Sequence, residues 1–260
     1  MSNISNINDI FEYLAYTANL ISRSYFGNKL ILKSGTALMS KLIECNRTDL
    51  SRLTGDLDIH CNNKEVWINF YTNIETILNN NNMGYVYKIT KRRSMEKGLV
   101  QSDSLVFELN DNGTIIKFKI DMNIKSNSII TVEYSPILNM TTYDAYTMLS
   151  DKISSVSSRV IFRRIKDLYD LAVLITLQDY SYTEIMKHIK IKHPNFEPVN
   201  MLTSSNFNDL EHAYKLYTGI RNKPGIEYLI GYCSTFLQPI YTGYKGELLW
   251  SAQLTSWTGQ

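Results

Sequence analysis

The sequence has no long apolar segment. None of its apolar runs approaches the roughly 18 residues that a membrane-spanning helix needs. Residues 1–9 show neither the basic segment nor the apolar segment of a signal peptide. We therefore expect a soluble, cytoplasmic protein without a membrane partner.

Cysteine is scarce as well. The 260 residues include three widely spaced cysteines, Cys45, Cys61 and Cys233. No Cys-x-x-Cys or Cys/His spacing accompanies them, so the sequence indicates neither a disulfide framework nor a zinc site. A reducing environment is consistent with this composition.

The chain also lacks an excess of charge of one sign. Its 27 Lys and Arg against 25 Asp and Glu give a net charge of +2, which is no overall signature of polyanion binding. Basic residues gather locally instead, and one group beside Tyr85 and Tyr87 consists of Lys88, Lys91, Arg92, Arg93 and Lys97. A second group consists of Lys187, Lys190, Lys192 and His193. Basic and aromatic residues interleaved in this way suit an RNA acceptor, and a solvated loop or hairpin face explains them equally well.

What the sequence does contain is a strand, a turn and a helix that suit a phosphate. Residues 30–32 are apolar and predict a buried strand, and residues 36–43 have apolar side chains at helical spacing. Between them lies the segment Lys33-Ser34-Gly35-Thr36. Such a turn directs free N–H groups and the positive helix end toward an anion, the glycine allows close approach, and either hydroxyl can donate. An ordinary helix N-cap would use the same residues.

Two carboxylates follow about twenty residues later. Asp56 and Asp58 are two apart on a predicted strand, so their side chains point to the same side while Leu57 and Ile59 pack inward. Two adjacent negative charges repel each other, and a divalent cation such as Mg²⁺ removes that repulsion. A solvated strand end is the alternative, but the preceding phosphate turn favours a metal site.

A third carboxylate lies on another predicted strand. In residues 114–124 the even positions from 116 onward are apolar and the odd positions from 117 to 123 are polar, which places Asp121 on a polar face. A plain charged face beside two lysines would look the same. A two-metal site, however, needs a further ligand from a neighbouring strand, and Asp121 can supply it.

The order of these motifs resembles the nucleotidyltransferase superfamily. The segment Arg52-Leu53-Thr54-Gly55-Asp56-Leu57-Asp58 carries the likeness together with the phosphate turn and the lone strand aspartate. Downstream, Asp151-Lys152-Ile153 and the run from Arg163 to Leu171 are similar to the AbiEii/AbiGii toxin family, which includes the MenT-type toxins. The family's Gly-Gly is Ser34-Gly35 here. Thr54 stands where the family usually has Ser, and in some relatives the hydroxyl at this position is phosphorylated.

The resemblance implies roles for residues in both halves of the chain. The metal ligands would be Asp56, Asp58 and Asp121 around two Mg²⁺, and Lys152 would lie on the triphosphate. Asp167 or Asp170 would be a functional carboxylate near the nucleotide or Lys152, although an ion-paired surface with Arg163 and Arg164 is an alternative. The nucleotide-binding residues would be Ser34, Gly35, Thr36, Arg52, Thr54 and Lys152.

The resemblance also implies a function. We expect an Mg²⁺-dependent nucleotidyltransferase toxin that adds a nucleotide from an NTP to an acceptor, commonly the 3′ end of tRNA. A separately encoded antitoxin would accompany it in a toxin–antitoxin or abortive-infection system. Three alternatives stay open: transfer to a small molecule, a kinase-like phosphotransfer, and a catalytically silent nucleotide-binding module.

The expected fold class is α+β. Residues 1–138 would form a nucleotidyltransferase-type mixed sheet with flanking helices near 7–23 and 64–79. Residues 139–260 would form an all-helical domain that completes the active-site cleft. Thr142 would cap its first helix, and the predicted helices span 142–157, 160–178, 182–191, 206–219 and 224–236.

Overall fold

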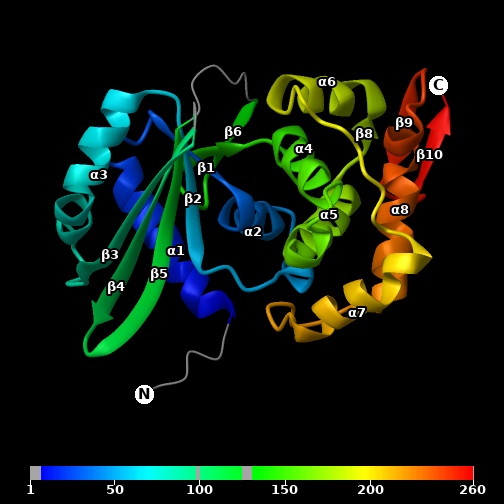
Figure 1. Cartoon of the computed structure of the whole chain (residues 1–260). Coiled ribbons are helices and arrows are strands. Elements are labelled where there is room, and N and C mark those ends of the chain that lie inside the picture. The colour runs from blue at the N-terminus through cyan, green and yellow to red at the C-terminus, as the bar shows by residue number, and fades with distance from the viewer. Residues whose placement is uncertain (1–6, 98–99, 125–130, 260) are drawn as a thin grey trace. The chain divides into compact units, whose positions relative to one another are not determined.

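The computed structural model describes residues 7–97, 100–124 and 131–259 (Figure 1). Within these residues the chain divides into two compact units. The first runs to Tyr143, and the second consists of Thr131 and the residues from Asp144 onward. A mixed sheet in the first unit and a mainly helical second unit confirm the α+β fold class.

The first unit is built on a seven-stranded mixed sheet with the strand order β3-β4-β5-β2-β1-β7-β6. Its strands are β1 (Leu30–Lys33), β2 (Asp56–Cys61), β3 (Val86–Lys97), β4 (Val100–Asp111), β5 (Thr114–Ile124), β6 (Val132–Ser135) and β7 (Met140–Tyr143). Its α-helices are α1 (Ile7–Ser22), α2 (Ser34–Glu44) and α3 (Lys64–Asn79).

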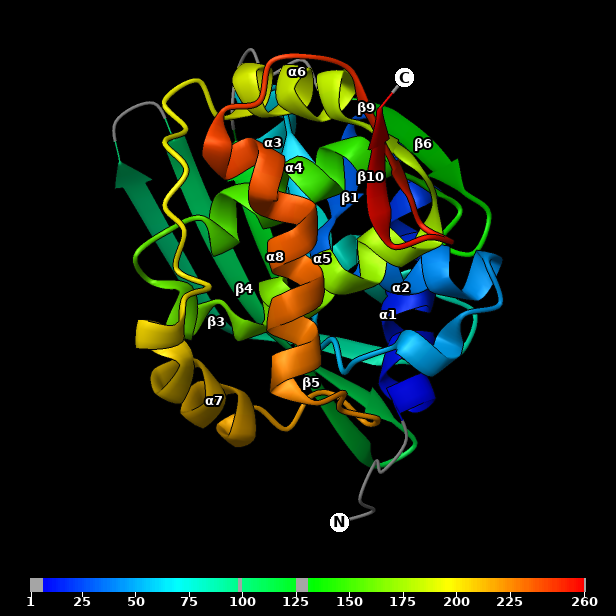
Figure 2. The ribbon, with the colours of Figure 1, turned by 90° about the vertical axis from the view of Figure 1, so that its right-hand side faces the viewer.

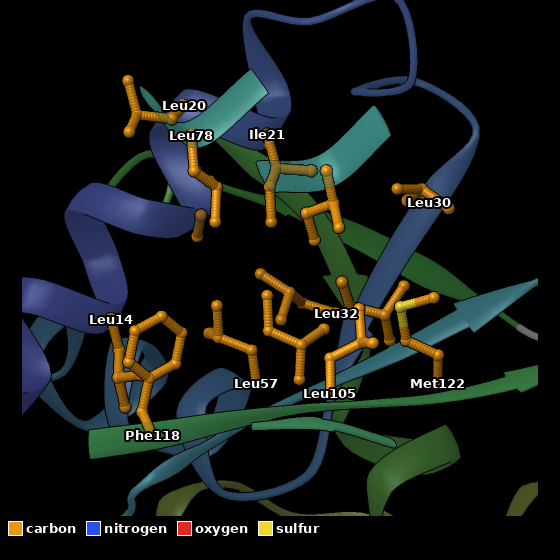
Figure 3. Packing of buried hydrophobic residues seen from close by; sticks show 14 of the residues in the cluster. Leu14, Leu20, Ile21, Leu30, Leu32, Leu57, Leu78, Leu105, Phe118 and Met122 are labelled. Atoms are coloured by element: carbon orange, nitrogen blue, oxygen red, sulfur yellow. The ribbon is translucent and has the colours of Figure 1, made fainter. Parts of the chain in front are cut away.

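One face of this sheet is apolar and carries the core of the unit. Helices α1 and α3 lie side by side on the same side of the sheet (Figure 1). The residues of β2, β4 and β5 that alternate inward pack against them: Leu57, Ile59, Leu105, Phe107, Ile120 and Met122 (Figure 3). Because strand side chains alternate, the residues between them share the opposite face.

The strongly periodic elements lie where the sequence predicted them. The helix at 64–79 and the strand at 114–124 have the predicted bounds, and α1 ends one residue earlier than expected. The predicted cap at Thr142 is wrong. This residue belongs to β7, where it lies opposite Glu133 of β6 and Leu32 of β1. The helix begins at Ala145, and Asp144 Oδ1 caps it by accepting from Thr147 N at 2.8 Å.

The second unit contains the five predicted helices. They are α4 (Ala145–Val156), α5 (Ile165–Leu177), α6 (Tyr182–Lys192), α7 (Phe207–Leu216) and α8 (Ile226–Thr242) (Figure 2). No helix among the described residues is long and apolar enough to cross a membrane.

The expectation that this unit is entirely helical is wrong. Three short strands form a sheet in the order β10-β9-β8: β8 (Tyr180–Ser181), β9 (Leu248–Ser251) and β10 (Ser256–Gly259). Trp250 of β9 is fully buried, and its Nε1 donates to Ile175 O of α5 at 2.8 Å. This anchor fixes the C-terminal hairpin on the helices, because a buried indole needs both apolar contacts and an acceptor.

Candidate functional site

The turn between β1 and α2 has an unusual backbone. Ser34 adopts φ of 61°, in the left-handed region that a residue with a Cβ enters at a cost of about 1 kcal/mol. This geometry accounts for a glycine at the corresponding place in the Gly-Gly motif described above, because glycine has no such cost. The backbone N–H groups at the start of α2 lack partners within the helix and so suit an anionic oxygen.

Gly35 is required by close packing. A Cβ at this position would lie 2.8 Å from Thr54 Oγ1 and 3.0 Å from Arg52 Nη2. The segment before β2 therefore lies directly against the turn. The structure thus brings together four of the expected nucleotide-binding residues of this unit, Ser34, Gly35, Arg52 and Thr54.

Replacing Gly35 by alanine tests this packing. Gly35→Ala should lower the free energy of unfolding by about 1–3 kcal/mol, because the new methyl group overpacks the turn. Thr54→Ala in the same background should recover part of the loss, since the threonine hydroxyl is the nearest obstacle. Urea denaturation of the two variants measures both effects. An unchanged stability in Gly35→Ala would mean that the turn relaxes freely.

Thr36 is placed differently from the expectation. Its side chain is buried, and its hydroxyl donates to the backbone carbonyl of Asp56 at 2.7 Å. A threonine has one O–H donor, so this donor is used inside the protein and is not left for a phosphate. The bond ties the first residue of β2 to the phosphate turn and thereby positions the carboxylate pair.

The three aspartates share one face of the sheet. β2 runs parallel to β5, and Asp58 lies opposite Asp121 in the register. Asp56 is two residues before Asp58, and all three side chains are half-buried. Like charges directly opposite each other on a sheet are destabilising, so this arrangement favours a bound cation.

The donor set fits magnesium in chemical type. Mg²⁺ prefers carboxylate oxygens together with substrate phosphate oxygens. Within residues 7–97, 100–124 and 131–259, however, no three His, Cys, Asp or Glu side chains converge closely enough to bind one metal ion. The aspartates share a face and a register, and joint binding would need their side chains to turn toward one point.

Two lysines lie beside the aspartates in a way that the sequence did not predict. Lys33 lies opposite Asp58 on the β1 side, and Lys119 lies opposite Asp56 on the β5 side. Each therefore projects from the same face as the aspartate beside it. Alternation along residues 114–124 put Lys119 on the polar face, but only the register between strands shows which carboxylate it adjoins.

Lys152, Asp167 and Asp170 form a buried cluster within the second unit. Lys152 Nζ lies 2.7 Å from both Asp167 Oδ1 and Asp170 Oδ2. The lysine is 5% exposed, and Asp170 is fully buried. Arg164 Nε adds a contact of 2.8 Å to Asp167 Oδ2, as expected for a pairing with Arg164. The alternative of an ion-paired surface is wrong for the two aspartates, and the role of Lys152 on a triphosphate stays a prediction.

The tyrosines near the first basic group make contacts inside their own unit. Tyr87 is 1% exposed, its hydroxyl lies 3.2 Å from that of Thr17, and burial raises its pKa. Tyr85 is half-buried, with its ring centroid 5.7 Å from Tyr13 and 5.4 Å from Tyr16. Tyr87 is therefore not available to stack on RNA bases, and Tyr85 packs against two tyrosines of α1. Only the backbone of Lys97 lies within the described structure.

Part of the second basic group is engaged inside its own unit. Lys192 is buried, and its Nζ lies 2.6 Å from Asp151 Oδ2. His193 Nε2 lies 3.1 Å from the other oxygen of the same carboxylate. Lys187 pairs with Glu184 at 3.1 Å. These contacts account for Lys192 and His193 within their own unit.

Both the sequence and the fold of this chain are similar to known proteins. A family model described as "Nucleotidyl transferase AbiEii toxin, Type IV TA system" matches residues 18–217. The crystal structure of JHP933 from Helicobacter pylori is similar in fold, with 15% identity, a TM-score of 0.57, and coverage of 92% of this chain and 93% of that one. A Megavirus polyadenylate synthase aligns with 9% identity and a TM-score of 0.35, over 98% of this chain and 47% of its own. No match was found among curated proteins.

Proposed function

This chain belongs to the AbiEii nucleotidyl transferase toxin family of type IV toxin–antitoxin systems, and from that premise we propose that it transfers a nucleoside monophosphate from an NTP to the 3′ end of tRNA in a magnesium-dependent reaction. The observation that carries the proposal is the register of the central strands. It sets Asp58 opposite Asp121 on the face that also carries Asp56. The Thr36 hydroxyl ties this carboxylate set to the phosphate turn.

In the proposed reaction the turn binds the leaving part of the nucleotide. The backbone N–H groups at the start of α2 and the Ser34 hydroxyl would hold the β- and γ-phosphates. Arg52, which lies against Gly35, would add a guanidinium to the same oxygens. This arrangement would leave the α-phosphorus directed toward the aspartates.

The aspartates would act where the attacking hydroxyl forms its bond to the α-phosphorus. Asp56, Asp58 and Asp121 would hold Mg²⁺, which supplies charge neutralisation and acidifies the attacking hydroxyl when bound. Asp121 would accept the proton of the acceptor 3′-hydroxyl. The oxygen then forms a bond to the α-phosphorus, the bond to the β-phosphate oxygen breaks, and pyrophosphate leaves.

The biological setting is proposed from the family. A toxin of a type IV system has an antitoxin, and we propose a separately encoded protein antitoxin for this chain in a toxin–antitoxin or abortive-infection system. The toxin and its RNA acceptor would then meet in the cytoplasm.

The test is transfer from each of the four α-labelled NTPs to total tRNA in the presence of Mg²⁺. Label in tRNA from one or more NTPs is the expected result, and it would identify the preferred base. Label that appears only from a γ-labelled NTP would replace the proposal by a kinase. Label in a small molecule but not in tRNA would overturn the RNA acceptor.

A further inference from the structure

The sheet face that carries the aspartates also carries a group of exposed cations, which we call the basic face. Its members are Lys88, Lys91 and Arg93 of β3 and Lys117 and Lys119 of β5. Glu108 of β4 lies between Lys88 and Lys117 in the register and contacts Lys117 at 3.0 Å. These five cations and one carboxylate leave a local excess of positive charge.

Residues that pair across neighbouring strands form rows, and two such rows connect the basic face with the aspartates. Across the strands, Arg93 lies opposite Ser104, and Ser104 lies opposite Asp121. In the neighbouring row, Lys91 and Lys119 lie on either side of Val106, and Lys119 lies opposite Asp56. Neighbouring strands are about 4.8 Å apart, so each row is a continuous path from the outer strand to the carboxylates.

A β-bulge in β3 creates this arrangement. The register shifts between Ile89 and Lys91, which leaves Thr90 as the extra residue. Without the shift, strict alternation from Lys88 would turn Lys91 and Arg93 toward the core face. The bulge instead places both on the face that carries the aspartates.

Arg92 lies between Lys91 and Arg93 in the sequence but belongs to the opposite face of β3. It lies opposite Leu105, a core residue, and its Nη1 donates to Tyr71 O of α3 at 3.0 Å. Its guanidinium carbon is 4.8 Å from the centroid of the Tyr71 ring. Arg92 is thus exposed but engaged with α3, so adjacent arginines of one strand serve different faces.

We propose that the basic face binds the sugar–phosphate backbone of the RNA acceptor and leads its 3′ end to Asp121. The inference rests on the proposed function and specifies where its acceptor lies. Exposed lysines and arginines in rows are suited to phosphates, and the burial of Tyr87 leaves the contact electrostatic rather than aromatic. Binding is therefore expected to depend strongly on salt and little on base sequence.

The experiment measures the affinity of the full-length protein for total tRNA from 50 to 300 mM salt, without NTP. In Lys91→Ser/Arg93→Ser the slope of log K against log salt should fall in magnitude by about 1.4–1.8, and Kd should rise about tenfold or more at the lower salt concentrations. Arg92→Ser, which removes one positive charge from the other face, should keep the wild-type slope and Kd within about twofold. Lys91→Arg/Arg93→Lys should bind like the wild type, and thermal melting verifies that each variant folds.

The outcomes separate this inference from the proposed function. Wild-type slope and affinity in Lys91→Ser/Arg93→Ser would overturn the inference even if the wild type labels tRNA, and would favour an acidic protein as the occupant. Salt-dependent tRNA binding through these residues without any label transfer would support the inference and contradict the proposed function. A wild type that binds no tRNA would overturn both.

Discussion

Asp58→Asn should abolish nucleotide transfer, lowering kcat by about 10³-fold or more. The substitution keeps the shape of the side chain but removes one negative charge from the pair formed with Asp121. Metal ligation and charge neutralisation contribute several kcal/mol to such a reaction, and about 4 kcal/mol corresponds to 10³-fold. Removal of Mg²⁺ with EDTA should have the same effect on the wild type.

The stability of this variant should change little. Loss of the Asp58 charge removes its repulsion from Asp121 but also its attraction to Lys33, which lies opposite it on β1, so the two effects oppose each other in the melting temperature. Glu65→Gln is a suitable control, since Glu65 is an exposed acid on α3, which packs on the apolar side of the sheet. Wild-type transfer by Asp58→Asn would contradict the metal site. A much lower melting temperature would show that the carboxylate has a structural role.

The positions of these carboxylates follow in large part from sequence periodicity. Alternation alone placed Asp56 and Asp58 on one side of a strand and Asp121 on a polar face. It did not determine which strands are neighbours. The parallel pairing of β2 with β5, which are separated in the sequence by the antiparallel pair β3 and β4, depends on tertiary packing. This pairing sets Asp58 opposite Asp121.

Other features depend on packing that leaves little local signal. Thr142 is a plausible cap and a good strand former, and pairing with Leu32 decides between the two. The short strands β9 and β10 show no periodicity long enough to predict them. The bulge at Thr90 reverses the side of every later residue in β3, so the face that carries Arg93 was not predictable from alternation.

Burial of ionisable side chains was the least predictable property. A lysine on a helix is usually exposed, and nothing in its own position marks Lys152 as 5% exposed. The indication comes from α5. Asp167 and Asp170 are both buried there, and buried carboxylates need a cation close by. Such a cluster is recognised only when α4 and α5 are known to pack together.

Lys152→Met should lower the free energy of unfolding by about 3–5 kcal/mol, the usual cost of removing one partner from a buried ion pair. The substitution keeps much of the side-chain volume but removes the ammonium that contacts both Asp167 and Asp170 at 2.7 Å. Asp167 keeps its contact with Arg164, so the loss falls mainly on Asp170. Lys190→Met, at an exposed position of α6, should change stability by less than about 0.5 kcal/mol. Urea denaturation of both variants measures the difference.

A second substitution separates stability from chemistry. Lys152→Met/Asp170→Asn removes the carboxylate along with its cation and should recover about 1–3 kcal/mol, a coupling typical of contacting charges. Absence of recovery would show that Asp170 is not the group that Lys152 stabilises. Transfer by the folded double variant then decides whether the pair has a role beyond stability. If transfer returns with stability, the cluster only supports the helices. A stable but inactive double variant would instead assign Lys152 or Asp170 to the reaction, because a loss of stability would no longer explain the loss of transfer.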